Sequence, residues 1–207
     1  MIPVVLLHAL ASSARTWDRF AAELPRVSIT LDLPGHGTGP RTGDYTFPAM
    51  ADHVREAIAA HDTVDVVGHS MGGAVAQHLA MRYPGLVRRM VIEDAAPPPH
   101  DPVPLGDPPP RPAEPVDFDW AVVEPVFRTI RTPDPSWWAA LPTITADTLW
   151  LAGGAESHVD QNRIHEAAAR MPSARVVEVA AGHRIHSEAP ERFAAAVLPF
   201  LTEPSAG

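Results

Sequence analysis

The 207-residue chain contains 45% hydrophobic and 20% charged residues and carries a formal net charge of −9 at pH 7. At this length we expect one domain with a substantial core. The negative charge disfavours nucleic acids and anionic membrane surfaces as partners, and the lack of cysteine excludes thiol nucleophiles, disulfides and thiolate metal sites.

Short apolar runs alternate with longer segments of helical periodicity along the chain. This alternation predicts an α/β fold, with a mostly parallel sheet of about six strands flanked by helices. The predicted strands, in chain order, are Val4–Leu7, Val27–Leu31, Val64–Val67, Leu86–Ile92, Thr148–Ala152 and Ala174–Val179. The predicted helices are Ala14–Leu24, Phe47–Ala60, Met71–Tyr83, Gln161–Met171 and Pro190–Leu201.

The region 95–142 breaks this pattern, because its many prolines cannot occupy helix interiors or central strands. The same region contains aromatic side chains, which are uncommon in disordered linkers. We therefore expect a short Pro-rich aromatic lid at 95–142, inserted into a single-domain core formed by 1–94 and 143–207.

The first residues, MIPVVLLHALASSA, resemble a signal peptide in their apolar stretch, but they lack a basic start and His8 interrupts the run. No run approaches the roughly 20 apolar residues of a transmembrane helix. We therefore expect a cytoplasmic protein without stable membrane insertion. The sequence predicts no particular oligomeric state.

A Gly-x-Ser-x-Gly motif lies between a predicted strand and a predicted helix, in the segment VDVVGHSMGG. Gly68 and Gly72 allow a sharp strand-to-helix turn where a Cβ would collide, and such a turn exposes the hydroxyl of Ser70. The helix that begins at Met71 directs free backbone N–H groups towards that hydroxyl. We predict that Ser70 is a nucleophile and that the backbone N–H of Met71 contributes to an oxyanion hole.

Four separated segments resemble those of the α/β-hydrolase fold family in order and spacing. They are His8–Leu10, Asp32–Gly37, Gly68–Gly73, and Gly182–His183 with Glu188–Phe193 downstream. The resemblance covers nearly the whole chain, which begins at what would be the family's third strand. It implies a shortened version of the α/β-hydrolase fold.

A serine hydroxyl needs a base within hydrogen-bond reach. The resemblance implies His183, which follows Gly182 in the loop where the family places its base, with His186 as the nearby alternative. It leaves two positions for the acid that orients the imidazole. Asp94 matches a subset of small esterases, and Glu156 matches the commoner family arrangement. We favour Asp94.

The resemblance also implies the backbone N–H of Leu10 as the second donor of the oxyanion hole, although Ala9 stands where the family usually has glycine. Glu93 should point away from its neighbour Asp94, towards solvent or a helix. The aromatic residues expected to line the substrate pocket are Trp17, Phe118, Trp120, Trp137 and Trp138. For Trp17, packing in the core is an equal alternative, and for half of the four residues from the insertion the alternative is that they only hold the lid to the body.

These residues imply a serine hydrolase that cleaves a small carboxylic ester through an acyl-enzyme, without a metal or organic cofactor. The expected partner is a small-molecule ester or thioester. A thioesterase, a lactonase, a C–C hydrolase or a cofactor-free perhydrolase would use the same residues, and a non-catalytic ligand receptor is the alternative outside enzymes. A metal site at His158, Asp160 and His165 is not predicted, because their spacing matches no known ligand pattern.

Overall fold

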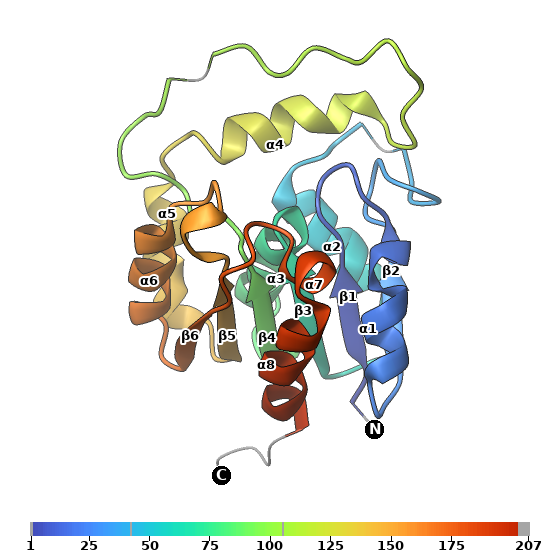
Figure 1. The fold of residues 1–207 in the computed structure, drawn as a ribbon, viewed down its shortest axis with the longest axis vertical. Coiled ribbons are helices and arrows are strands. Elements are labelled where there is room, and N and C mark those ends of the chain that lie inside the picture. The colour runs from blue at the N-terminus through green and yellow to red at the C-terminus, as the bar shows by residue number, and fades with distance from the viewer. Residues whose placement is uncertain (1, 42, 105, 203–207) are drawn as a thin grey trace.

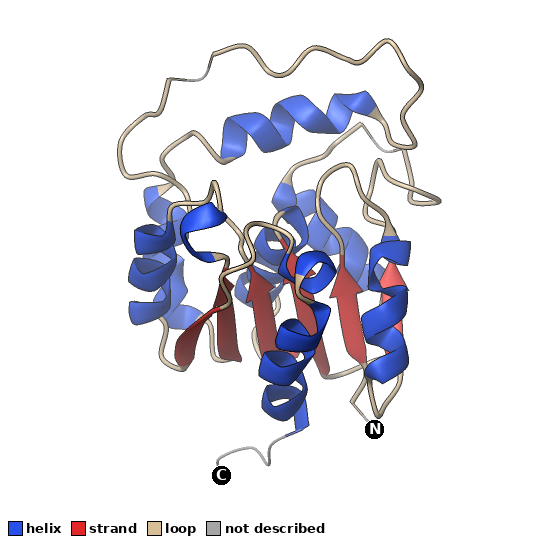
Figure 2. Cartoon of the chain, viewed as in Figure 1, coloured by secondary structure: helices blue, strands red, loops and turns tan. Residues whose placement is uncertain are grey.

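The computed structural model describes residues 2–41, 43–104 and 106–202, in which one parallel six-stranded sheet lies between two layers of helices (Figures 1 and 2). The strands are β1 (Val4–Leu7), β2 (Ser28–Leu31), β3 (Val64–His69), β4 (Val87–Glu93), β5 (Asp147–Ala152) and β6 (Ala174–Glu178). Their order in the sheet is β2-β1-β3-β4-β5-β6, and each neighbouring pair is parallel. The six predicted strands are confirmed, with ends that differ by one or two residues.

Helices cover both faces of this sheet. They are α1 (Asp18–Glu23), α2 (Phe47–Ala57), α3 (Met71–Arg82), α4 (Val123–Thr129), α5 (Pro135–Ala140), α6 (Gln161–Ala169), α7 (Ile185–Glu188) and α8 (Pro190–Thr202). Val66 and Met90 pack in the core shared with α2, α3 and α6, whereas Val67 and Val91 pack in the core shared with α1 and α8. Successive side chains of a strand point to opposite faces, so burial on both faces requires the almost continuous apolar runs of the central strands.

The strand order reverses its direction at β1. The chain passes from β1 to β2 at the edge and then returns to β3 on the other side of β1. In open parallel sheets, ligands bind at the carboxyl ends of the strands where the order reverses in this way. The loop after β1 and the turn after β3 both lie at this point.

The insertion 95–142 contains two helices that the sequence did not predict. Figure 1 shows one of them, α4, above the carboxyl ends of the strands. The other, α5, begins with Pro135, which suits the first turn of a helix. Its preceding residue, Asp134, caps the helix by accepting a hydrogen bond from the backbone N–H of Trp137 at 3.0 Å. The division of the chain into a core and a lid stays a prediction.

No helix within residues 2–41, 43–104 and 106–202 combines the length and the apolar character needed to cross a bilayer. The cytoplasmic location expected from the sequence stays a prediction.

Candidate active site

Ser70 occupies a strained backbone position between β3 and α3. Its φ of 50° and ψ of −113° lie outside the regions that L-residues usually adopt. A Cβ on Gly68 would lie 2.4 Å from the carbonyl oxygen of Gly72, and a Cβ on Gly72 would lie 2.3 Å from the carbonyl oxygen of Leu7. Glycine at both positions therefore permits the sharp turn that carries Ser70.

Two further strained residues lie near this turn. Within the described part of the chain, Ala11, Ser70 and Asp94 are the residues other than glycine with positive φ, at 60°, 50° and 43°. They follow β1, β3 and β4, three neighbouring strands of the sheet. Because backbone strain concentrates at functional sites, its presence after three adjacent strands indicates such a site at their carboxyl ends.

His183 forms a hydrogen-bonded pair with Asp94. The ring Nδ1–H of His183 donates to Oδ2 of Asp94 at 2.8 Å. His183 lies in the loop between β6 and α7, and Asp94 follows β4, so the two residues come from distant parts of the chain. A carboxylate on Nδ1 leaves Nε2 as the free ring nitrogen, which is the arrangement a general base requires.

Asp94 is fully buried and accepts several further hydrogen bonds. They come from the backbone N–H of Gly153 at 2.9 Å, the hydroxyl of Ser157 at 2.5 Å and the side-chain amide of Gln161 at 3.2 Å. Burial alone would raise the pKa of Asp94, but the hydrogen bonds from His183 and these donors outweigh it and hold the pKa below its ordinary value. Asp94 is therefore a fixed carboxylate at neutral pH.

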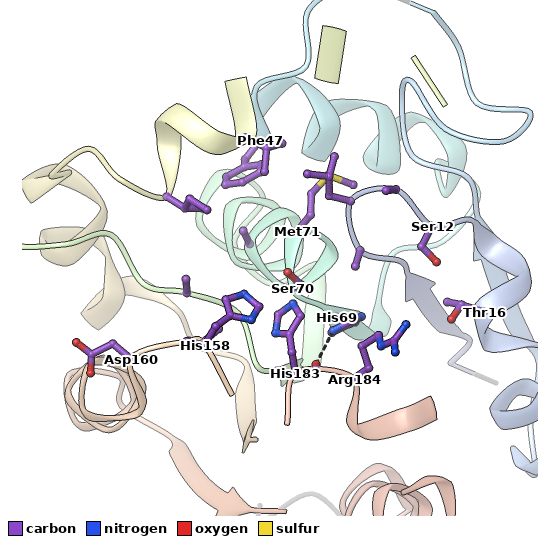
Figure 3. A pocket seen from close by; sticks show the side chains of 18 of the residues that line it. Ser12, Thr16, Phe47, His69, Ser70, Met71, His158, Asp160, His183 and Arg184 are labelled. Atoms are coloured by element: carbon purple, nitrogen blue, oxygen red, sulfur yellow. Dashed lines mark hydrogen bonds between the residues drawn. The ribbon is translucent and has the colours of Figure 1, made fainter. Parts of the chain in front are cut away.

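Ser70 and His183 line the same cavity, which has a volume of about 730 Å³. Figure 3 shows the hydroxyl of Ser70 turned towards the imidazole of His183. Leu10 and Met71, the predicted oxyanion donors, also line this cavity. The structure thus brings together, at one cavity wall, the predicted nucleophile, base and oxyanion donors, with Asp94 directly behind the base.

Glu156 lies at the end of a short 3₁₀ helix, Gly154–Glu156, and its side chain is exposed. Among the described residues it forms no hydrogen bond or ion pair with His183, whose ring nitrogen Nδ1 is held by Asp94. Of the two acids that the sequence left open, the structure brings Asp94 to the imidazole and not Glu156.

The loop after β1 is held by His36. Burial lowers the pKa of His36 to about 4, so its ring is neutral at pH 7. Its Nδ1–H donates to the carbonyl of Pro34 at 3.1 Å, and its Nε2 accepts the backbone N–H of Ala11 at 3.2 Å. The imidazole therefore supports the strained backbone of Ala11, next to Leu10.

A second buried carboxylate holds the other end of the His183 loop. Glu93 accepts two hydrogen bonds from His186, one from the backbone N–H at 2.8 Å and one from the ring Nδ1–H, which lies 2.9 and 2.8 Å from the two carboxylate oxygens. The Nε2 of His186 accepts the hydroxyl of Thr16 at 2.9 Å, and Nε2–H of His69 donates to the carbonyl of His183 at 2.8 Å. The expected helix contact of Glu93 is confirmed, because His186 lies in α7, whereas the fully buried Glu93 does not face solvent.

His69, Glu93 and His186 also place their side-chain nitrogen and oxygen atoms within 4.8 Å of one another, close enough for a metal ion. Each of these residues already has hydrogen-bond partners, however. A metal ion would have to displace the hydrogen bond between the His186 ring and Glu93. The hydrogen bonds alone therefore account for the arrangement of this cluster.

The aromatic residues expected to line the pocket do not line it, and this expectation is corrected. For Trp17 the alternative is confirmed, because its side chain is buried in the core, where its ring packs against Phe20, Phe193 and His186. The remaining expected residues, all from the insertion, are Phe118, Trp120, Trp137 and Trp138. The ring of Phe118 stacks on His36 of the body and contacts Trp120, whereas Trp137 and Trp138 are buried in the core and Arg170 of the body lies over the Trp138 ring. The insertion lines the cavity instead through Ala96, Val103, Val126, Ile130 and Arg131.

Two buried histidines make the folded protein sensitive to acid. Burial lowers the pKa of both His36 and His69 to about 4, from an ordinary value of 6.5. The folded protein therefore binds fewer protons than the unfolded chain between pH 6.5 and 4, so the stability from these groups is complete above pH 6.5 and is lost as the pH falls towards 4. In this window, each histidine lowers the unfolding free energy by up to about 1.4 kcal/mol for every pH unit of acidification.

Urea unfolding between pH 7 and 4.5 measures this slope. His36→Gln removes one titrating group and keeps an oxygen that can accept the N–H of Ala11. We therefore expect the slope of unfolding free energy against pH to fall in this variant by up to about 1.4 kcal/mol per pH unit. An identical slope in the wild type and His36→Gln would contradict the neutral state of His36.

Comparisons with known sequences show which family this chain resembles. The sequence matches the model of the alpha/beta hydrolase family over residues 4–196. Lipase LipV of Mycobacterium tuberculosis is 38% identical over 96 residues, which cover 45% of this chain and 37% of the relative. The sn-1-specific diacylglycerol lipase ABHD11 of Xenopus laevis is 36% identical over 103 residues, which cover 47% of this chain and 33% of the relative. These matches span about a third of the length of the curated relatives.

Similar solved structures cover nearly the whole chain. A hydrolase from Pseudomonas aeruginosa has a TM-score of 0.80 at 25% sequence identity, over 98% of this chain and 90% of that one. The esterase EaEST from Exiguobacterium antarcticum has a TM-score of 0.80 at 18% identity, over 98% of this chain and 92% of that one. At 18% identity, the similarity to EaEST shows a shared fold and no more.

Proposed function

Because the chain belongs to the alpha/beta hydrolase family, we propose that it is a serine esterase that cleaves a small carboxylic ester. The observation that carries the proposal is the hydrogen bond between His183 and the buried Asp94, at the wall of the cavity that Ser70 also lines. A hydroxyl, an imidazole and a carboxylate in this order form the set required for acyl transfer through a covalent intermediate.

In the proposed reaction, Oγ of Ser70 attacks the ester carbonyl carbon while Nε2 of His183 takes the hydroxyl proton. Asp94 stabilises the resulting imidazolium. The oxyanion of the tetrahedral intermediate accepts hydrogen bonds from the backbone N–H groups of Met71 and Leu10. The ester C–O bond then breaks and His183 returns the proton to the leaving alcohol. Water repeats the sequence on the acyl-enzyme, which releases the acid and restores Ser70.

The cavity favours a small substrate with an apolar part. Its volume of about 730 Å³ lies in the range of small-molecule sites, roughly 300–1,000 Å³. Phe47, Val126 and Ile130 contribute apolar surface to the wall of this cavity. A hydrocarbon acyl or alcohol group fits such a wall better than a polymer does.

A substrate panel tests this proposal. The purified protein is assayed with p-nitrophenyl acetate, butyrate and hexanoate, with butyryl-CoA, and with a simple lactone. We expect the highest kcat/KM for one of the p-nitrophenyl esters. A kcat/KM at least about tenfold higher for the thioester would identify a thioesterase, and higher turnover of the lactone would identify a lactonase.

Glu93 is expected to act as a positioning residue in this reaction. We expect Glu93→Gln to lower kcat by about 10- to 100-fold with little change in KM, because removing the charge loosens the loop that carries His183 and small misplacements of a base are costly. Glu191→Gln is the matched control, because the exposed Glu191 on α8 binds Arg19, does not line the cavity and should keep the wild-type kcat. Equal kcat in both variants would contradict the positioning role.

A further inference from the structure

The cavity that Ser70 lines gathers positive charge although the chain as a whole is negative. Three arginines line it, Arg131, Arg163 and Arg184, against a formal net charge of −9 for the protein. Among the described residues that line the cavity, Asp160 is the only one with an acidic side chain. The concentration of guanidinium groups is therefore a local property of this cavity.

Two of the three arginines are already neutralised. Nε of Arg163 lies 2.9 Å from Oδ2 of Asp160, and a terminal nitrogen of Arg184 lies 2.9 Å from Oε1 of Glu188. Arg131 differs from them, because it forms no ion pair with any carboxylate of the residues described. Its charge is available to a ligand in the cavity.

The guanidinium of Arg131 is held in place by its own segment. It lies over the ring of Phe127, with its carbon 3.7 Å from the ring centroid, and stacking of this kind restricts the side chain. The backbone carbonyl of Arg131 accepts the N–H of Val103 at 3.3 Å, which ties two parts of the insertion together. Val126 and Ile130, just before Arg131 in the chain, line the apolar wall of the same cavity.

An arginine that is partly withdrawn from water, stacked and without a counter-ion is suited to bind an anionic group of a ligand. We infer that the substrate of this site carries a negatively charged group, such as a carboxylate, which binds to Arg131 at the end of the apolar wall formed by Val126 and Ile130. This inference rests on the proposed function, because it assigns a substrate class to the cavity that Ser70 lines.

Matched ester pairs test the inference with the charge on either side of the ester bond. One pair is p-nitrophenyl valerate and p-nitrophenyl hydrogen glutarate, with the charge on the acyl group. The other is phenyl butyrate and 4-butyryloxybenzoate, with the charge on the alcohol. For each ester, kcat/KM of Arg131→Gln is divided by that of the wild type, which cancels differences in intrinsic reactivity.

We expect Arg131→Gln to lower kcat/KM about 10- to 100-fold for the charged ester of at least one pair and less than about twofold for its neutral partner. Arg128→Gln is the control, because the exposed Arg128 on α4 binds Glu124 and does not line the cavity. It removes the same charge from the same segment and should change neither ester.

Two results would overturn the inference. Equal losses for charged and neutral esters would assign Arg131 to the positioning of the insertion, and no loss for any ester would leave the cation without a role in binding. Both differ from a failure of the proposed function, in which the wild-type protein would hydrolyse none of the four esters.

Discussion

Ser70→Ala is expected to lower kcat/KM for p-nitrophenyl esters by about 10⁴- to 10⁶-fold while the protein stays folded. The nucleophile is lost completely, whereas the remaining cavity still binds substrate. The strained φ of 50° at this position penalises alanine as much as serine, so thermal unfolding should change little. Initial rates with the variant at high enzyme concentration give the size of the loss.

Ser12→Ala is the matched control for this variant. Ser12 lines the same cavity and also presents a hydroxyl, as Figure 3 shows, but it lies in the loop after β1 and not at the strained turn between β3 and α3. Its variant should keep activity within a few-fold of the wild type. Activity within tenfold of the wild type in Ser70→Ala would assign the reaction to another nucleophile.

Asp94→Asn is expected to lower kcat by about 10⁴-fold, because an amide in place of the carboxylate selects the wrong imidazole tautomer and cannot stabilise the imidazolium. An asparagine also turns an NH₂ group towards donors such as the hydroxyl of Ser157, so we expect a lower unfolding free energy as well. Steady-state kinetics and urea unfolding measure the two effects separately.

Glu156→Gln distinguishes the two acids that the sequence left open. Glu156 is exposed and does not contact His183, so this variant should keep kcat within about twofold of the wild type. Collapse of kcat in Glu156→Gln with full activity in Asp94→Asn would reverse the assignment of the acid.

The strands and the turn around Ser70 were predictable because their signals are local. A buried parallel strand needs a continuous apolar run, and the strand-to-helix turn needs glycine at Gly68 and Gly72, so a few neighbouring residues carry the information. The helix α5 was missed although Asp134 and Pro135 form a start signal, because the many prolines before them indicated irregular structure.

The pairing of residues across the fold could not be read in the same way. His183 and Asp94, like His186 and Glu93, are about 90 residues apart in the chain, and their contacts depend on which strands become neighbours. Family resemblance narrowed the acid to two positions, and in the structure Asp94, not Glu156, is hydrogen-bonded to the His183 ring. The significance of Arg131 depends on the absence of an ion-pair partner within the described residues, which no local pattern encodes.

The aromatic residues were mispredicted for a related reason. Large aromatic side chains bury more apolar surface than any others, so their default place is a core or a contact between segments. Trp137 and Trp138 follow this default, whereas the aliphatic Val126 and Ile130 line the cavity. Composition of the insertion alone did not distinguish an aromatic anchor from a pocket wall.

Covalent labelling of Ser70 tests the central claim most directly. The folded protein is treated with a p-nitrophenyl alkylphosphonate, and peptide mass spectrometry locates the adduct. We predict one adduct per chain, on Ser70, formed rapidly in the wild type and at least about a thousandfold more slowly in His183→Ala, because the imidazole activates the hydroxyl. An adduct on any other residue, or equal labelling rates with and without the imidazole, would contradict the account.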